Sequence, residues 1–134
     1  MIERIKYKKE EIAIIIRNSY NKNGCEFFTP NFYSQQLGYM CHDAGHKIEP
    51  HYHIETSRDV KKTQEVLFIK SGKVKVNFFT TEEVFIQSII LEKGDVILLA
   101  SQGHGFEMLE KSEMIEVKQG PYQGDKDKKR FKTK

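Results

Sequence analysis

Two histidines separated by one residue are the first feature of this sequence that could do chemistry. His51 and His53 flank Tyr52, and Pro50 precedes them. On a β-strand, residues i and i+2 point to the same face, so two imidazoles about 7 Å apart along the strand can converge on one ion. Proline favours an extended backbone at this point. The pair therefore indicates a metal site, although two unrelated surface histidines would show the same spacing.

Two further side chains downstream could complete such a site. Glu65 directly precedes an apolar run, and a strand that begins there could carry its carboxylate to the two histidines. His104 lies between Gly103 and Gly105, after another apolar run. Glycines on both sides allow a histidine to be aimed into the mouth of a barrel without crowding the backbone.

The elements that must position these residues read as short antiparallel strands. Apolar or alternating runs follow one another and are separated by turn residues, which is typical of a barrel or a two-sheet sandwich. In the run 73–79, period-two alternation predicts that Val74, Val76 and Phe78 face the interior. Ser71-Gly72 is a hairpin turn signal. The expected strands cover residues 11–17, 25–29, 36–42, 48–54, 66–70, 73–79, 84–91, 96–100, 106–109 and 114–118.

The spacing of the candidate ligands resembles the first sequence motif of the cupin superfamily. That motif runs Gly, five residues, His-x-His, a few residues, Glu, six residues, Gly. Gly45, His51, His53, Glu65 and Gly72 occupy those places. Eleven residues separate His53 from Glu65, where the family usually has three or four. We expect the additional residues, 54–64, to form a polar loop over the mouth.

The second cupin motif is matched less closely. Gly94 opens it and His104 stands near the place of its histidine. Ala100 replaces the motif proline, His104 falls one residue early, and Met108 stands where the motif has Asn. The resemblance covers residues 37–118 and is closest to small, single-domain bacterial-type cupins. It implies an all-β fold, a double-stranded β-helix or jelly-roll barrel. The whole chain, 1–134, would be one domain with a basic, extended tail from about residue 120.

The same resemblance implies four metal ligands: His51, His53, Glu65 and His104. Glu55 and Gln64 are alternative oxygen donors to Glu65. Three imidazoles and one carboxylate suit a divalent transition metal, Fe, Mn, Ni, Co or Zn, better than Ca or Mg. The pattern does not choose among these ions.

Other polar residues near the motifs could contact the ligands or a substrate. They are His42, His46, Arg58, Gln64 and Glu107. His42 and His46 also fit loop histidines that face water, and Arg58 fits a solvated charged loop. No catalytic residue is assigned.

Three functions fit this pattern. The first is a metal-dependent enzyme that acts on a small polar molecule, with oxygenase, isomerase, epimerase and lyase chemistry all open. The second is a metal-free isomerase similar to the cupins that act on sugar nucleotides, with a histidine pair as acid and base. The third is a module that binds a sugar or another small ligand without catalysis.

The distribution of charged and apolar residues indicates which binding partners and which cellular compartment to expect. The net charge is +3, but residues 118–134 alone carry seven Lys/Arg and two Asp. A short basic tail is typical of a solvated terminus rather than a nucleic-acid interface. No apolar run approaches the length of a membrane span, and no leader pattern opens the chain. We therefore expect a cytoplasmic protein with Cys25 and Cys41 as free thiols, a small-molecule ligand, and no nucleic-acid or membrane partner. The oligomeric state stays open, with a homodimer among the candidates.

Overall fold

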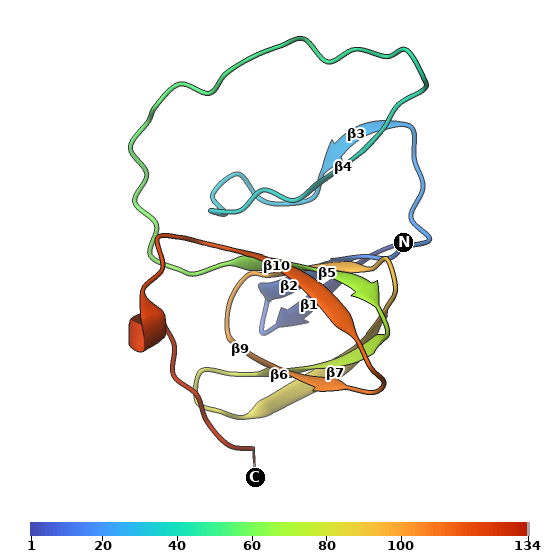
Figure 1. Cartoon of the computed structure of the whole chain (residues 1–134). Helices are drawn as coiled ribbons and strands as arrows, with labels where there is room; N and C mark the ends of the chain where they lie inside the picture. Colours follow the sequence, from blue (N-terminus) through green and yellow to red (C-terminus); the bar gives the residue numbers. More distant parts are fainter. Residues whose placement is uncertain (134) are drawn as a thin grey trace.

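The computed structural model describes residues 1–133, and its architecture is all-β (Figure 1). Ten strands form three antiparallel sheets, in the orders β1-β2-β8-β5-β10, β7-β6-β9 and β3-β4. The strands are β1 (Ile2–Tyr7), β2 (Glu10–Ile16), β3 (Gly24–Phe27), β4 (Gly38–Cys41), β5 (Glu65–Ser71), β6 (Lys73–Phe79), β7 (Phe85–Glu92), β8 (Val96–Leu99), β9 (Gly103–Met108) and β10 (Glu113–Lys118). A short 3₁₀ helix, η1 (Gly124–Asp127), follows them.

The main core lies between the five-stranded and the three-stranded sheet. The side chains of Val74, Val76 and Phe78 are almost completely buried, which confirms the facing predicted for β6. They pack with apolar residues of the opposite sheet, including Ile15, Leu67, Ile69 and Ile97. The polar residues that alternate with them on β6 are only partly buried. This core fixes the two sheets face to face, as in a β-sandwich.

A second apolar cluster covers the other face of the five-stranded sheet. Ile14 and Leu98 are buried there, next to Phe28 and Leu37 from the segment that carries the β3–β4 hairpin. β2 and β8 are therefore covered on both faces, which explains why their sequences are continuously apolar instead of alternating.

The chain changes sheets at Ser71-Gly72, so the predicted hairpin at this position is wrong. β5 pairs with β8 and β10, whereas β6 pairs with β7 and β9. Gly72 has φ +91°, and a Cβ atom there would overlap Ser112. The glycine is thus required for a close crossing between sheets rather than for a two-residue turn.

The strand expected over residues 48–54 is also absent. Residues 42–63 form an exposed segment without regular structure, which links β4 to β5 as a wide arch (Figure 1). Alternation alone does not make a strand, because the backbone groups need a neighbouring strand to pair with.

The all-β prediction is confirmed at the level of three antiparallel sheets. Within residues 1–133, no ladder joins the sheets into a closed barrel, and the jelly-roll assignment stays a prediction. Cys25 and Cys41 are both free thiols, as expected. None of the helices in the described part of the chain has the length and apolar character needed to cross a membrane.

Candidate functional site

Glu65 and His104 meet at one end of the space between the two facing sheets. The Glu65 Oε1 and His104 Nε2 atoms lie 2.7 Å apart, and the two side chains are 12% and 28% exposed. Glu65 begins β5 in the five-stranded sheet, and His104 lies near the start of β9 in the three-stranded sheet. The structure therefore brings together the two predicted ligands that belong to different sheets.

Strand periodicity explains why both side chains point inward. On β5, Glu65 shares a face with Leu67 and Ile69, which are core residues. On β9, His104 lies opposite Phe78 of β6, whose side chain is buried in the same core. The pair thus closes the apolar core at the point where the core reaches solvent.

Gly103 allows β9 to approach β6 closely beside this pair. A Cβ atom at Gly103 would lie 3.3 Å from the backbone oxygen of Phe79, which is tighter than ordinary contact. The glycine next to His104 therefore has a role in the packing of β9 against β6. At Gly105 the nearest atom to an added Cβ would be 3.9 Å away, so that position is less restricted.

A second carboxylate, Glu116 of β10, affects the pKa of Glu65. Burial raises the pKa of Glu65, but hydrogen bonds from His104 and Glu116 and the charges of His104 and Lys118 lower it, and the pKa lies below its ordinary value. The hydrogen bond to Glu65, burial and the charge of Glu65 raise the pKa of Glu116. Of the two carboxyl groups, Glu65 is therefore the one more readily ionised.

Glu65 and His104 border a cavity of about 690 Å³. Besides Glu65 and His104, its lining includes Lys118 and the tail residues 127–131. The Phe131 ring packs edge-on against Phe79, with ring centroids 5.2 Å apart. Lys129 Nζ lies 3.8 Å from Glu83 Oε2. The C-terminal tail, expected as a solvated coil, therefore covers part of this mouth.

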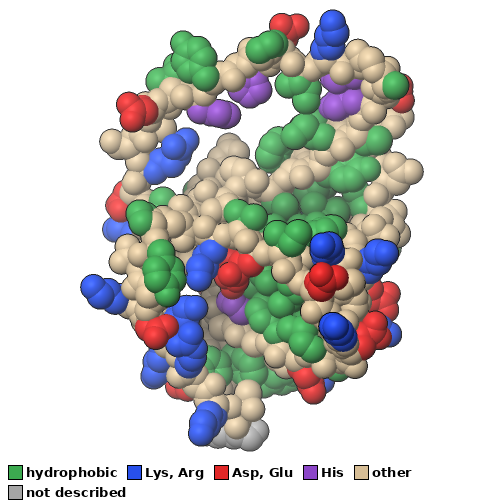
Figure 2. Space-filling model, viewed as in Figure 1, with side chains coloured by type: hydrophobic (Ala, Val, Ile, Leu, Met, Phe, Trp, Pro, Cys, Tyr) green, Lys and Arg blue, Asp and Glu red, His purple; other side chains and the backbone are tan. Residues whose placement is uncertain are grey.

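The tail residues are the part of the site that sequence reasoning missed. Phe131 is the only aromatic residue in the charged run 125–134, and this was the one signal that the tail docks. Figure 2 shows Lys and Arg side chains gathered around this end of the molecule.

His51 and His53 lie apart from this mouth, on the exposed segment 42–63. Their ring centroids are 5.4 Å apart, and His51 Nδ1 lies 2.9 Å from the Glu49 backbone oxygen. Figure 2 shows histidine side chains along the arch that this segment forms. Within residues 1–133, no group of three or more His, Cys, Asp or Glu side chains is arranged to hold a metal ion. The structure thus joins two of the four predicted ligands and leaves the histidine pair separate.

The remaining candidate residues have other surroundings. His42 and His46 stack on each other with ring centroids 3.9 Å apart. Arg58 and Glu55 are exposed. Glu107 is exposed on β9, opposite Lys75, on the face away from His104.

The Gln64 side chain holds neighbouring segments together and does not offer a free oxygen as a metal ligand. Its side chain is buried, and its Oε1 accepts hydrogen bonds from Ser34 Oγ at 3.3 Å and the Gln35 backbone nitrogen at 3.1 Å. Its Nε2 donates to the Ala100 backbone oxygen at 3.4 Å. These contacts hold the start of β5, and with it Glu65, in place.

No family model, no curated protein and no solved structure matches this chain. The function must therefore be inferred from the geometry of the mouth and from the chemistry of the residues around it.

Proposed function

We propose that this chain is a metal-binding protein of the cupin type, in which Glu65 and His104 supply two of the ligands and His51 and His53 supply the other two. The contact between Glu65 and His104 carries the proposal. These residues come from different sheets and from the two separate motifs that resemble the cupin pattern. A carboxylate and an imidazole at hydrogen-bond distance, on inward faces at the edge of an apolar core, form half of such a site.

The free edge of β9 offers a place for the histidine pair. Among the described strands, β9 pairs only with β6. We propose that residues 48–54 add to this edge as an antiparallel strand, because an unpaired edge presents a row of backbone donors and acceptors. In that register the side chains of His51 and His53 would share the inward face with His104.

Two linking segments would connect the proposed strand to the rest of the chain. Six residues, 42–47, separate the end of β4 from the proposed strand, and nine residues, 55–63, connect it to the anchored Gln64. Nine extended residues reach about 30 Å. The proposal requires that these two links span the distances from β4 and from Gln64 to the edge of β9.

The residues at the mouth suit a transition metal and a small polar ligand. A carboxylate whose pKa lies below its ordinary value is ionised near neutral pH and is available as a ligand. When bound, the ion would supply Lewis-acid activation of a ligand oxygen. Lys118, Thr80 and Thr81 also border the cavity, and the Lys118 ammonium would orient an anionic group of such a ligand. These features favour the enzymatic form of the proposal, with the reaction class open.

The decisive measurement is metal content per folded chain after loading with Mn(II), Fe(II), Ni(II) or Zn(II). Replacing His51, His53 or His104 with Ala should each remove most of the bound metal, because each change deletes a direct ligand. Glu65→Ala should weaken binding less, because water or Glu55 could take its place. His42→Ala is the matched control and should leave most of the metal bound. Full occupancy in folded His51→Ala and His53→Ala proteins would overturn the site.

Amide hydrogen exchange tests the proposed strand separately. In the metal-loaded protein, the amides of alternate residues in 48–54 should exchange more slowly than those of residues 55–62. Uniformly fast exchange across 42–63 in a loaded protein would exclude the added strand.

A metal-free acid–base or ligand-binding site is the second candidate. It is favoured by the His104–Glu65 pair, which needs no metal to form, and by the absence of a three-ligand group among residues 1–133. In this case His104 Nε2 would donate to Glu65, which orients the ring, and the other ring nitrogen, Nδ1, would be left to exchange a proton. A parent protein that stays empty with all four metals would support this candidate.

A further inference from the structure

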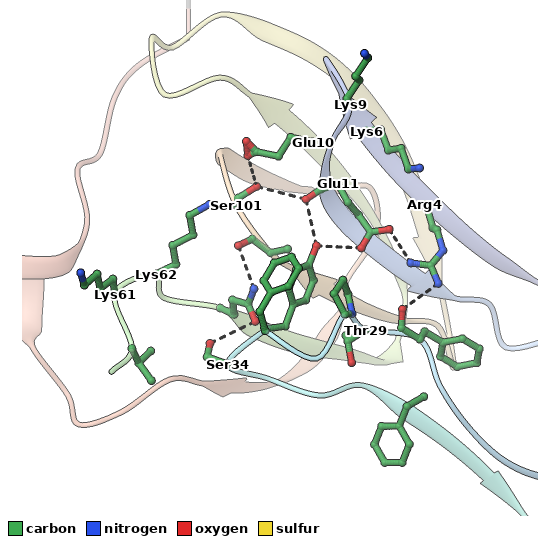
Figure 3. A pocket seen from close by; sticks show the side chains of 18 of the residues that line it. Arg4, Lys6, Lys9, Glu10, Glu11, Thr29, Ser34, Lys61, Lys62 and Ser101 are labelled. Atoms are coloured by element: carbon green, nitrogen blue, oxygen red, sulfur yellow. Dashed lines mark hydrogen bonds and ion pairs between the residues drawn. The ribbon is translucent and has the colours of Figure 1, made fainter. Parts of the chain in front are cut away.

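A second cavity, of about 860 Å³, lies on another part of the molecule (Figure 3). It is bordered by β1, the start of β2, the segment from Phe27 to Ser34, and residues 59–62. It shares no lining residue with the cavity at Glu65 and His104. The linings of the two cavities can therefore be described separately.

One wall of this cavity is aromatic. The side chains of Phe27 and Phe32 line it although they are 55% and 85% exposed. Phe32 packs edge-on against Tyr33, with ring centroids 5.3 Å apart. Gly38 lies directly against the Phe27 ring, and a Cβ atom there would come within 2.8 Å of it. Exposed ring surfaces held in place beside a cavity are suited to stack on a planar ligand.

The carboxylates of the cavity already have partners. Glu11 Oε2 accepts from Arg4 at 2.6 Å, and Glu11 Oε1 accepts from the Tyr33 hydroxyl at 3.0 Å. The Ser101 hydroxyl donates to Glu10 Oε2 at 2.9 Å. Figure 3 shows these contacts as one network across the floor. The acids are thus engaged within the protein and are poorly placed to recognise a cation.

The excess charge of the lining is positive. Five Lys or Arg residues border the cavity against three Asp or Glu, a net charge of +2. Lys61 lies 3.8 Å from Asp59. Lys62 has no ion pair within residues 1–133, and Figure 3 shows its side chain extending toward Ser101. Lys62 is also two residues from the buried Gln64, which limits the movement of its backbone.

We propose that this cavity binds a planar aromatic ring that carries a phosphate or a carboxylate group. The ring stacks against Phe27 and Phe32, and the anionic group is held by the Lys62 ammonium. The aromatic wall accounts for the ring and the positive excess accounts for the anion. This inference uses residues 59–62 as they lie in the arch, so it is tested on the metal-free chain.

The test uses 1-naphthyl phosphate as the probe, with 1-naphthol and inorganic phosphate as separate ligands. Backbone amide shifts in a titration of the full chain should move at Phe27, Phe32 and Lys62 but not at His104. The probe should bind at least tenfold more tightly than either fragment, because only the probe engages both the wall and Lys62. Raising the salt concentration should weaken it. Shifts that are absent from these residues, or equal binding of 1-naphthol, would overturn the proposal.

Two variants with matched controls measure separately how much the aromatic wall and the lysine contribute to binding of the probe. Phe32→Ala and Lys62→Ala should each weaken the probe about tenfold, equivalent to about 1.4 kcal/mol. Phe85→Ala and Lys93→Ala change an exposed ring and an exposed ammonium that line neither cavity, and they should bind like the parent. Parent-like affinity in both Phe32→Ala and Lys62→Ala would exclude this site.

Discussion

At the scale of single residues, Asp95 is a buried charge with a full set of partners. Its side chain is 4% exposed. One oxygen accepts from the Asn18 backbone nitrogen at 2.8 Å, and the other accepts from the Glu92 backbone nitrogen at 2.8 Å and Arg17 Nη1 at 2.9 Å. Arg17 also contacts Glu3. One carboxylate therefore joins the end of β2 to the turn between β7 and β8.

Asp95→Ala should lower the free energy of unfolding by about 3 kcal/mol, because it removes one of the partners of Arg17 and leaves two backbone donors without a partner. Denaturant unfolding measures the change. Asp59→Ala is the control, since that side chain is highly exposed, and it should change stability by less than about 0.5 kcal/mol. Equal effects of the two changes would contradict the structural role of Asp95.

Two tyrosines should titrate at unusually high pH. The hydrogen bond to Glu26 and burial raise the pKa of Tyr20 to about 12, and burial and the hydrogen bond to Glu11 raise the pKa of Tyr33 to about 12. A raised pKa means that the folded state favours the protonated form. The contribution to stability is full below the ordinary pKa of about 10 and is lost as the pH rises through about 12.

Phenolate absorbance should therefore show a titration step near pH 12. Tyr20→Phe and Tyr33→Phe should each remove part of this step. Tyr122→Phe is the control because its side chain is exposed. If all six tyrosines titrate together while the chain remains folded, the hydrogen bonds to Glu11 and Glu26 do not persist in solution.

At the scale of elements, sequence patterns succeed where one face of a strand is buried. The bounds of β6 and the facing of its side chains follow directly from alternation over Lys73–Phe79. β1 was not predicted, because it is charged at Glu3, Arg4 and Lys6 and is held by pairing with β2. Pairing partners of this kind are set by the fold and not by local composition.

Gly72→Ala should destabilise the crossing between β5 and β6 by about 2 kcal/mol or more, because the backbone is left-handed and an added Cβ overlaps Ser112. Gly45→Ala is a matched control: Gly45 has φ +89° and no atom within 4 Å of an added Cβ. Both variants place a side chain at a positive φ, so the difference between their free energies of unfolding, measured with denaturant, gives the cost of the overlap with Ser112. A smaller loss at Gly72 than at Gly45 would show that the crossing tolerates a side chain.

At the scale of the whole molecule, half of the candidate site follows from the sequence. The resemblance in spacing anticipated that Glu65 and His104 meet, although neither local alternation nor composition requires it. The histidine pair was assigned to a strand, but residues 42–63 lack the neighbour that would stabilise one. The docking of the tail had one signal in the sequence, Phe131, but its position against Phe79 could not be predicted because it depends on tertiary contacts.

A chain that ends at Gly124 should still fold, and its melting temperature should fall by less than about 5 °C, because the tail adds little buried apolar area. Thermal unfolding followed by circular dichroism checks this. Phe131→Ala in the full chain is the companion variant and should account for most of the change. A larger loss in the shortened chain would make the tail part of the core structure.

The order of strands in the large sheet has a consequence for biosynthesis. β5 lies between β8 and β10, which are both made after it, and β10 ends only at Lys118. A nascent chain that has released β5 therefore carries an apolar strand with two open edges. The edge that pairs with β8 stays open until Leu99 is made, and the edge that pairs with β10 stays open for nearly fifty further residues. Such edges favour aggregation, and non-local pairing is slow. The yield of this protein should depend on chaperones that shield β5 during translation, more than on the stability of the finished sheets.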